Sequence, residues 1–320
     1  MVSTPPAAAT AAPISPGRAD VLAQVARQMD TEEPSMHRPT HPTFRSLMQP
    51  GRLLRVAGAH DALGGLLAER AGFDAVWSSS LEVSAARALP DASLLTMTEY
   101  LEAAAHMQKA LSVPVVADCD SGYGNNANAA HMVHEYEAAG ITAISIEDKK
   151  FPKMNSFADR GNSLVDTAEF CRKLHTVKNA QSSGDFFVIA RTEALINGLP
   201  VSEAMHRAHA YADAGADAIL IHSKAHTNEQ VVDFLNRWES RLPVVVVPTT
   251  YPDWHADVMA TAGVSVVIYA NHGLRATITG LRETFASILT HGDTTKLEED
   301  LAPVRDVFAL QRLDAWQALD

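Results

Sequence analysis

Two kinds of apolar pattern alternate along this 320-residue chain from about residue 50 onward. Short runs rich in Val, Ile and Ala predict buried strands, and longer segments with apolar residues at three- and four-residue spacing predict helices. Eight such strands, alternating with helices, indicate the α/β class and a parallel sheet closed into a (β/α)8 TIM-type barrel. The predicted strands are residues 53–57, 75–77, 113–117, 143–146, 186–190, 218–221, 244–247 and 264–269, and helices between them include residues 98–111, 126–139, 166–178, 202–214 and 228–238.

An internal repeat supports this register. The dipeptide Ala-Gly precedes the second, fourth, sixth and eighth predicted strands, at Gly72, Gly140, Gly215 and Gly263. At each place a helix must stop and the chain must turn into the next strand, a position that favours a positive φ. The sequence therefore predicts left-handed glycines at these four helix ends.

The two ends of the chain are expected to lie outside the barrel. Residues 1–40, which begin with a stretch rich in Ala, Pro, Ser and Thr, predict a disordered or loosely ordered extension. Residues 41–293 form the predicted barrel, with its eighth helix at about 274–289. Residues 294–320 predict one or two helices whose apolar stripe includes Leu301, Val307 and Phe308, and this segment must pack on the barrel or on a partner subunit.

Carboxylates follow two neighbouring strands directly. Asp118 and Asp120 end the third strand, and Glu147 and Asp148 end the fourth. Active sites of such barrels lie at the carboxyl ends of the strands, so these side chains are expected to converge. Carboxylates without histidine or thiolate partners suit Mg²⁺, with Mn²⁺ as the alternative ion.

Polar residues also end the other strands. The loop after Glu147 carries Lys153, Asn155 and Ser156, which bring a positive charge and hydrogen-bond donors to an anionic substrate. The remaining candidates at strand ends are Ser79 and Ser80 after the second strand, Arg191 and Glu193 after the fifth, His222 after the sixth, Thr249 and Thr250 after the seventh, and Asn271 and His272 after the eighth.

Composition narrows the functional classes. A hydrophobic fraction of 47% and a charged fraction of 20% are typical of a soluble globular protein. The formal charge of -12 argues against nucleic acid as a partner. Cys119 and Cys171 form neither a disulfide framework nor a CxxC metal site, which favours a reducing cytoplasm. No apolar run reaches ~18 residues, so no membrane span is expected.

Seven longer motifs lie at or near the strand ends: Trp77-Ser78-Ser79-Ser80-Leu81, Pro90-Asp91, Asp118 to Asn125, Glu147-Asp148-Lys149 through Ser156, Ala190 to Ala194, Ile221 to Lys224 and Asn271 to Arg275. With these motifs the chain resembles the phosphoenolpyruvate mutase branch of the isocitrate lyase superfamily, from about Val56 to Leu310. The resemblance implies a Mg²⁺-dependent barrel enzyme whose eighth helix is swapped between the subunits of a homodimer, with homotetramers common.

The resemblance also implies roles for single residues. It makes Asp118 the direct metal ligand, and Arg191 and His222 the residues that face the phosphoryl group and the carboxylate side of the pocket. Lys153, Asn155 and Ser156 belong to a gating loop that closes over the substrate. The other implied residues are Asp91, Asp120 and Glu147, which hold metal-bound waters, and Ser79, Ser80 and Leu81, which contact the substrate carboxylate and the oxygens near the metal.

The implied reaction interconverts phosphoenolpyruvate and 3-phosphonopyruvate, with formation of a carbon–phosphorus bond. Two departures keep a phosphonopyruvate hydrolase or a superfamily lyase as alternatives: Ser80 replaces a usual glycine, and residues 90–95 replace a typical Arg-Asp-x-Asn-Glu-Ala-Ser run. The loop lacks the cysteine motif of the lyases, and Asn155 favours a mutase because the hydrolase usually has threonine there. A barrel that only binds a carboxylate is disfavoured, because four converging carboxylates would repel one another without benefit.

Overall fold

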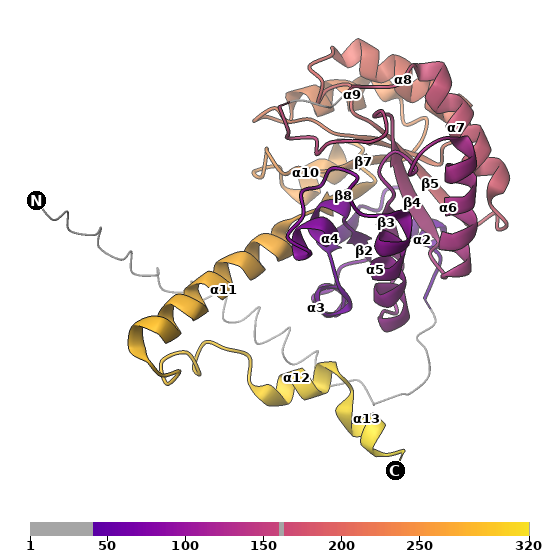
Figure 1. Ribbon diagram of the computed structural model, residues 1–320. Coiled ribbons are helices and arrows are strands. Elements are labelled where there is room, and N and C mark those ends of the chain that lie inside the picture. Colours follow the sequence, from indigo (N-terminus) through magenta and orange to yellow (C-terminus); the bar gives the residue numbers. More distant parts are fainter. Residues whose placement is uncertain (1–40, 160–162, 320) are drawn as a thin grey trace, which may run out of the picture.

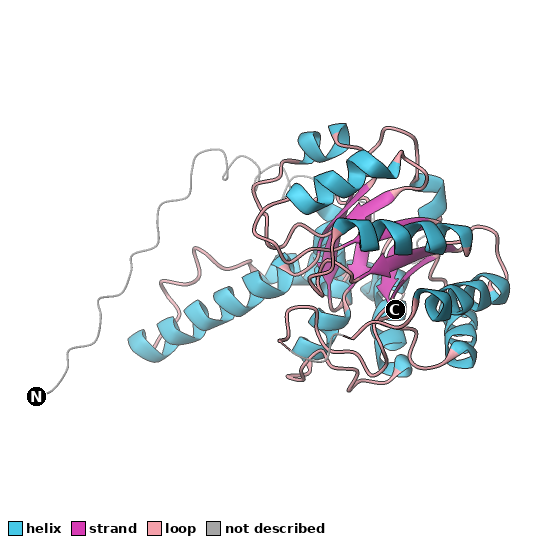
Figure 2. Ribbon diagram, turned by 90° about the horizontal axis from the view of Figure 1, so that it is seen from above, coloured by secondary structure: helices cyan, strands magenta, loops and turns pink. Residues whose placement is uncertain are grey.

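The computed structural model describes residues 41–159 and 163–319, and within them the chain forms a closed barrel of eight parallel strands in the order β1 to β8 (Figure 1). The predicted (β/α)8 TIM-type barrel is confirmed. Helices surround the strands, as the view from above shows (Figure 2). The predicted N-terminal extension, residues 1–40, lies outside the described residues, and the division of the chain at residues 293 and 294 stays a prediction.

Each predicted strand is present, with bounds that differ from the prediction by at most two residues. All neighbouring pairs are parallel, including β1 with β8, which closes the barrel. The strands are β1 Leu54–Ala59, β2 Ala75–Ser78, β3 Val115–Asp118, β4 Ala143–Glu147, β5 Phe187–Thr192, β6 Ala218–Ile221, β7 Val244–Val246 and β8 Val266–Tyr269.

The helices follow the predicted periodicity equally closely. A capping box of Thr96 and Glu99 starts α5, and a second box of Asn125 and Asn128 starts α6. The helices are α2 Phe44–Leu47, α3 Ala62–Arg70, α4 Ser80–Ala86, α5 Met97–Ala110, α6 Asn126–Ala138, α7 Thr167–Ala180, α8 Val201–Asp213, α9 Glu229–Trp238, α10 Ala256–Thr261, α11 His272–His291, α12 Val304–Leu310 and α13 Leu313–Gln317.

Two apolar cores hold the barrel. One fills its interior, where Phe44 from α2 closes the amino-terminal end and meets Phe187 edge-on, with ring centroids 5.3 Å apart. The other lies between the strands and the surrounding helices. The four repeated glycines confirm their prediction, because Gly72, Gly140, Gly215 and Gly263 have φ between 85° and 95°. The two cores hold the strands in place, so the carboxyl ends of the strands form the rim opposite Phe44.

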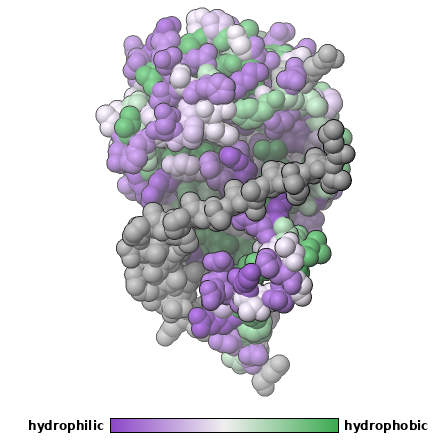
Figure 3. Space-filling model, turned by 90° about the vertical axis from the view of Figure 1, so that its left-hand side faces the viewer, coloured by the Kyte–Doolittle hydropathy of each residue, from purple (hydrophilic) through white to green (hydrophobic). Residues whose placement is uncertain are grey.

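Helix α11 does not pack along the barrel as the other helices do. Its first turns contact β1, after which it projects away from the barrel (Figures 1 and 2). None of its 20 residues is buried, and Phe285 and Leu289 are 58% and 87% exposed. The two predicted carboxyl-terminal helices follow as α12 and α13. Figure 3 shows this side of the molecule, where hydrophobic patches interrupt the polar surface.

An eighth helix of the barrel would pack beside β8 and β1, and the two helices that flank this place also expose apolar side chains. In a barrel closed between β8 and β1, that position lies between α10 and α3. Leu63 and Leu67 of α3 are 51% and 45% exposed, and Val258 of α10 is 56% exposed. Apolar surface is therefore present both on α11 and on the two barrel helices that would flank it. Within residues 41–159 and 163–319, no helix is long and apolar enough to cross a membrane.

Candidate active site

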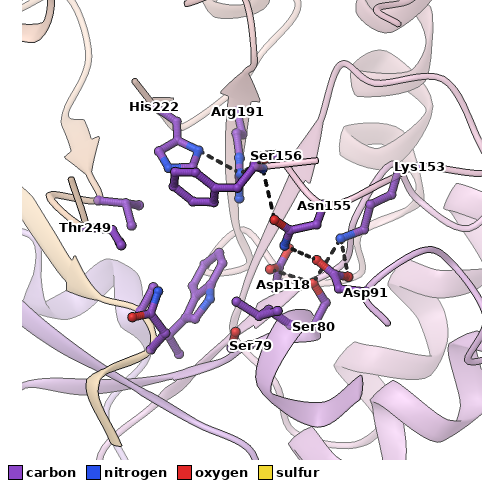
Figure 4. A pocket seen from close by; sticks show the side chains of 16 residues that line it. Ser79, Ser80, Asp91, Asp118, Lys153, Asn155, Ser156, Arg191, His222 and Thr249 are labelled. Carbon is purple, nitrogen blue, oxygen red and sulfur yellow. Dashed lines mark hydrogen bonds and ion pairs between the residues drawn. The ribbon is translucent and has the colours of Figure 1, made fainter. Parts of the chain in front are cut away.

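A pocket opens at the carboxyl ends of the strands (Figure 4). Most of the predicted site residues line it. Asp120 and Glu147 do not, and lie behind the lining, where each is paired with a lining cation. The lining residues are Trp77, Ser79, Ser80, Leu81, Asp91, Asp118, Lys153, Asn155, Ser156, Phe157, Arg191, His222, Val247, Thr249, Ala270 and Asn271.

Helix α4 places the serines at the floor of the pocket. Ser79 is the N-cap, and its hydroxyl accepts a hydrogen bond from the backbone N–H of Glu82 at 3.3 Å. Ser80 and Leu81 form the first turn, where backbone N–H groups have no acceptor within the helix. The Ser80 hydroxyl donates to Oδ2 of Asp118 at 3.0 Å. This turn can therefore offer donors to a carboxylate beside the acidic cluster.

Lys153 lies at the centre of the acidic cluster. Its ammonium is 2.5 Å from Oδ1 of Asp91 and 3.0 Å from Oδ1 of Asp120. The Asn155 amide donates to the other oxygen of Asp91 at 2.8 Å (Figure 4). Lys153 and Asp91 are 4% and 6% exposed, so these ion pairs are shielded from water. They hold residues 153 and 155 over the pocket.

The carboxyls differ in how readily they ionise. Burial raises the pKa of Asp118, and Arg191 and Lys153 oppose this only in part. Burial also raises the pKa of Asp120 to about 7, and the nearby Lys153 ammonium, 3.0 Å from Oδ1, lowers it only in part. Apart from this ion pair, neither carboxylate oxygen of Asp120 has a hydrogen-bond partner among the described residues. Burial alone would raise the pKa of Asp91, but the Lys153 ammonium and the Asn155 amide lower it overall.

This donor set fits a divalent cation. When all five carboxyls around the pocket are ionised, they outnumber the three basic side chains by two, an excess of negative charge that a bound cation would offset. Among the described residues, no three histidine, cysteine or acidic side chains converge closely enough to hold an ion together. A hard ion with one protein ligand and several waters suits such a site. The carboxylates are Asp91, Asp118, Asp120, Glu147 and Glu193, and the cations are Lys149, Lys153 and Arg191.

Arg191 connects the acidic cluster to His222. Its Nε is 2.6 Å from Oε1 of Glu193 and 3.2 Å from Oε2 of Glu147. Its Nη2 is 2.9 Å from Nδ1 of His222. Burial works against the charge of Arg191, but Glu193 and Glu147 raise its pKa overall. The guanidinium therefore stays cationic at the pocket wall.

His222 presents a donor to the pocket. Burial and the charge of Arg191 lower its pKa, so the ring is neutral near pH 7. Oε1 of Glu193 lies 3.2 Å from Nδ1 but already accepts from Arg191. Because Arg191 can only donate, Nδ1 accepts from it and the ring proton belongs on Nε2. That nitrogen is buried and has no hydrogen-bond partner within the described residues, so it can donate to an anion.

The chain between Asp148 and Val165 is here named the covering loop, and its residues 160–162 are not described. Residues 153 and 155–157 of this loop line the pocket. Ser156 is held by three partners: its hydroxyl donates to Oε2 of Glu193 at 2.6 Å and accepts from Lys149 at 2.8 Å and Arg191 at 2.9 Å. Phe157 meets His222 edge-on, with ring centroids 5.8 Å apart.

The opposite wall of the pocket is sparsely bonded. Trp77, Val247 and Ala270 make it largely apolar, and Thr249 and Asn271 are its polar members. Oδ1 of Asn271 is buried without a hydrogen-bond partner among the described residues. Figure 4 shows Thr249 across the pocket from Asp91, Asp118 and Lys153.

Some of these residues had no predicted role. Position at a strand end had singled out Thr249, Asn271 and Glu193 without assigning them one. Lys149 was likewise marked by its place after the fourth strand, without a role. No sequence signal marked Phe157 as part of the pocket, because a phenylalanine in a loop gives no local sign of what it contacts.

Three comparisons with known proteins show which proteins this chain is similar to. The sequence profile of the family described as phosphoenolpyruvate phosphomutase matches residues 44–289. Phosphonopyruvate hydrolase of Variovorax sp. (strain Pal2) is 42% identical over 279 residues, which are 87% of this chain and 96% of that protein. The crystal structure of phosphoenolpyruvate phosphomutase from Streptomyces platensis subsp. rosaceus is 50% identical, covers 92% of this chain and 96% of its own, and gives a TM-score of 0.82. Phosphonopyruvate hydrolase in complex with oxalate and Mg²⁺ is 40% identical, with 86% and 95% covered and a TM-score of 0.81.

Proposed function

Because the chain belongs to the phosphoenolpyruvate phosphomutase family, within the isocitrate lyase superfamily of enzymes, we propose that it is a phosphoenolpyruvate mutase. In this reaction the bond between phosphorus and the enol oxygen breaks, and a bond between phosphorus and C3 forms, giving 3-phosphonopyruvate. Both the substrate and the product are small anions. The charged pocket and its neutral His222 donor suit such ligands.

Three side chains would hold the phosphoryl group between its two positions. Transfer passes through a loose transition state, so positioning and charge neutralisation carry most of the catalysis. Arg191 supplies a fixed positive charge, Nε2 of His222 donates a proton in a hydrogen bond, and the Asn155 amide donates from the covering loop. Arg191 is anchored by Glu193 at 2.6 Å, so it stays in place while the pyruvate portion turns.

The carboxylate of the substrate would lie on the floor of the pocket, at the first turn of α4. Ser79, Ser80 and Leu81 offer the donors of the first turn of α4 to the carboxylate. Mg²⁺, when bound at Asp118 with waters held by Asp91, Asp120 and Glu147, would supply positive charge next to the carboxylate and the enol oxygen. The hydrolase relative in complex with oxalate and Mg²⁺ supports this choice of ion.

The covering loop carries the observation on which the mutase proposal rests. Asn155 lies inside the pocket, tied to Asp91 at 2.8 Å, and Lys153 beside it is 4% exposed. A loop held this tightly excludes water, which is the competing nucleophile for a phosphoryl group in transfer. An amide at this position keeps the group directed toward carbon.

A direct test follows the phosphorus atom. Purified protein is incubated with 3-phosphonopyruvate and Mg²⁺ and observed by phosphorus NMR, with a chelator in the control sample. The mutase proposal expects the phosphoenolpyruvate signal to appear with Mg²⁺, and the spectrum to stay unchanged in the sample with chelator. Release of inorganic phosphate with pyruvate would instead assign the chain to the hydrolase.

The hydrolase is the second candidate because the Variovorax hydrolase is 42% identical over most of this chain. The run that begins at Pro90 also favours it, and Ser80 departs from the mutase pattern. A superfamily lyase acting on a 2-oxo or enol carboxylate is a more distant alternative, since neither Cys119 nor Cys171 lies on the covering loop. In the same NMR experiment, absence of any phosphorus change would lead to a screen of such substrates.

Helix α11 supports a second proposal, that two copies exchange this helix in a homodimer, which can pair into a homotetramer. The 58% exposed Phe285 of α11 and the exposed Leu63, Leu67 and Val258 of the barrel form two apolar surfaces. Packing α11 of one copy between α3 and α10 of the other would cover both surfaces at once. The exposed apolar residues of α12 and α13 extend the same interface.

Light scattering at micromolar concentration tests this exchange. The intact protein should have at least twice the chain mass of 34.4 kDa. Phe285→Asp should lower the measured mass to that of a monomer, because it places a charge in the apolar contact. Arg282→Glu on the same helix is the matched control and should leave the mass unchanged. A monomeric wild type with full activity would contradict the exchange.

A further inference from the structure

The two ends of the covering loop are joined into a neck. Lys149 and Leu164 form an antiparallel bridge. The backbone N–H of Lys150 donates to the carbonyl of Ser163 at 2.8 Å, and the N–H of Val165 donates to the carbonyl of Asp148 at 2.9 Å. The loop therefore emerges from one short, hydrogen-bonded base, and the orientation of that base sets where its residues lie.

Asp148 anchors this neck below the pocket. Its side chain is fully buried and does not line the pocket. Oδ1 accepts from the backbone N–H of Glu193 at 2.9 Å. Oδ2 accepts from the hydroxyl of Thr192 at 3.1 Å and from the hydroxyl of Tyr211 at 2.7 Å. The carboxylate of Asp148, at the end of β4 and the start of the neck, is thus joined to the end of β5 and to α8.

Arg207 of α8 contacts both ends of the neck. Its Nη1 donates to Oδ2 of Asp148 at 3.1 Å and to the carbonyl of Val165 at 3.1 Å. The same nitrogen lies 3.2 Å from the Tyr211 hydroxyl. Its Nε donates to Glu203 one turn earlier, at 2.8 Å, which orients the guanidinium. Arg207 is 8% exposed, so water can replace these bonds only poorly.

From these contacts we infer that Arg207 is a positioning residue, which sets the covering loop over the pocket by joining Asp148 at its start to Val165 at its end. It does not line the pocket, and it acts through the neck. Lys153, Asn155 and Ser156 then reach the pocket only while this base is held. The kinetic consequence rests on the proposed function, whereas the effect on the loop itself does not.

Replacing the guanidinium should loosen the loop and little else. Arg207→Met removes the donors and keeps a side chain of similar length, so Asp148 loses one partner and Val165 loses its only side-chain donor among the described residues. Glu203→Gln is the matched control, because it changes only the half-buried outer partner of Arg207. Tyr211→Phe is a second variant that removes one bond to Asp148 and keeps the ring packed against Phe170.

Amide hydrogen exchange measures the loop without any turnover. In the full chain with Mg²⁺ and no substrate, peptides within residues 149–159 should exchange about tenfold faster or more in Arg207→Met, with a smaller rise in Tyr211→Phe. Peptides from β3, β6 and β7 should keep their wild-type rates in both. Glu203→Gln should match the wild type throughout.

Kinetics give the second readout. A loop displaced by about 1 Å can cost up to about 100-fold in rate, so kcat should fall in Arg207→Met. The inference is overturned if loop exchange stays at the wild-type rate, or if every barrel peptide accelerates to the same degree, which would indicate a purely structural role. If the wild type shows no turnover of 3-phosphonopyruvate, the proposed function fails, and the exchange result still decides the role of Arg207.

Discussion

The two sides of the pocket are built in different ways. On the charged side, Asp91, Lys153 and Arg191 each have at least two polar partners within 3.2 Å from distant parts of the chain. On the opposite side, Val247 and Ala270 have no polar side chain to bond, and Asn271 keeps a buried oxygen without a partner within the described residues. The charged side is thus a network of ion pairs and hydrogen bonds, whereas the opposite side is a largely apolar surface with few polar contacts.

This difference indicates which side performs the chemistry. A network of buried charges is costly to build and loses much when one member is removed. A plain apolar wall gives shape and excludes water, and it tolerates change because few bonds depend on it. The charged side should therefore respond sharply to substitution and to pH, and the opposite side should respond weakly.

The largest effect is expected from Asp118→Ala. This change removes the carboxylate that is proposed to bind Mg²⁺ directly, so turnover should fall below detection and titration calorimetry should show no Mg²⁺ binding in the micromolar to millimolar range. Asp257→Ala is the control, because the Asp257 side chain is 93% exposed and does not line the pocket. Near wild-type activity of Asp118→Ala at low Mg²⁺ would contradict the metal assignment.

Asn155→Ala should give the next largest effect. Loss of one donor to the transition state typically slows a reaction by about 10-fold to 1000-fold, and formation of phosphoenolpyruvate should slow within that range. The share of free phosphate should rise, because the phosphoryl group loses its orientation toward carbon. Phosphorus NMR measures both quantities in one sample. An unchanged rate of phosphoenolpyruvate formation would show that the loop does not touch the reacting group.

The acidic cluster should make Mg²⁺ binding depend on pH. The pKa of Asp120 is raised to about 7 in the metal-free protein, so protons compete with the ion below that pH. One competing proton at pKa 7 makes the apparent affinity about tenfold weaker at pH 6 than at pH 8. Calorimetry at the two pH values measures this ratio, and Asp120→Asn should reduce the ratio toward one.

The same pKa has a consequence for stability. The native state holds this proton more tightly than the unfolded chain, whose aspartates have a pKa of about 3.9. The metal-free fold should therefore lose stability as pH rises from about 4 through 7, and added Mg²⁺ should restore it at pH 8. Because the lowered pKa of His222 acts in the opposite sense, the melting temperature is compared with that of Asp120→Asn. Absence of a fall relative to this variant over the window, without metal, would contradict the shift of Asp120.

Thr249→Val should have the smallest effect. Valine has nearly the shape of threonine, and the hydroxyl contributes at most one weak hydrogen bond, so kcat and KM should each change by less than about fivefold. Steady-state kinetics with phosphoenolpyruvate formation as the readout suffices. A loss of 100-fold would mean that the plain side holds a group essential to the reaction, and the contrast between the two sides would be wrong.

The barrel and its rim were predictable from sequence because both depend on local pattern. The strands are continuous apolar runs, and the ends of those runs are enough to place Asp118, Arg191 and His222 at the same rim. The glycine repeat marks the helix ends in the same way. Each of these signals lies within a few residues of the feature it predicts.

The contacts between loops could not be predicted in this way. Lys153 pairs with Asp91 across a separation of 62 residues, and nothing near either residue indicates the pairing. Arg207 has the ordinary spacing of a residue on α8, so its contacts with the neck were invisible in the sequence. The apolar stripe of α11 predicts a packed helix equally well whether the partner surface belongs to its own barrel or to another copy.

Helix α11 is joined mechanically to the pocket at its root. Asn271, which lines the pocket, directly precedes the first residue of this helix, and Gly273 approaches the backbone of Gly58 at the end of β1. A helix of 20 residues is a lever about 30 Å long, so a swing of about 10° at its root moves its tip by about 5 Å. Conversely, if the free end of α11 is held in position to within about 1 Å, the angle of the helix at its first turn is fixed to within about 2°. Contacts that hold the far end of α11 in place therefore also restrict the movement of the pocket wall at Asn271.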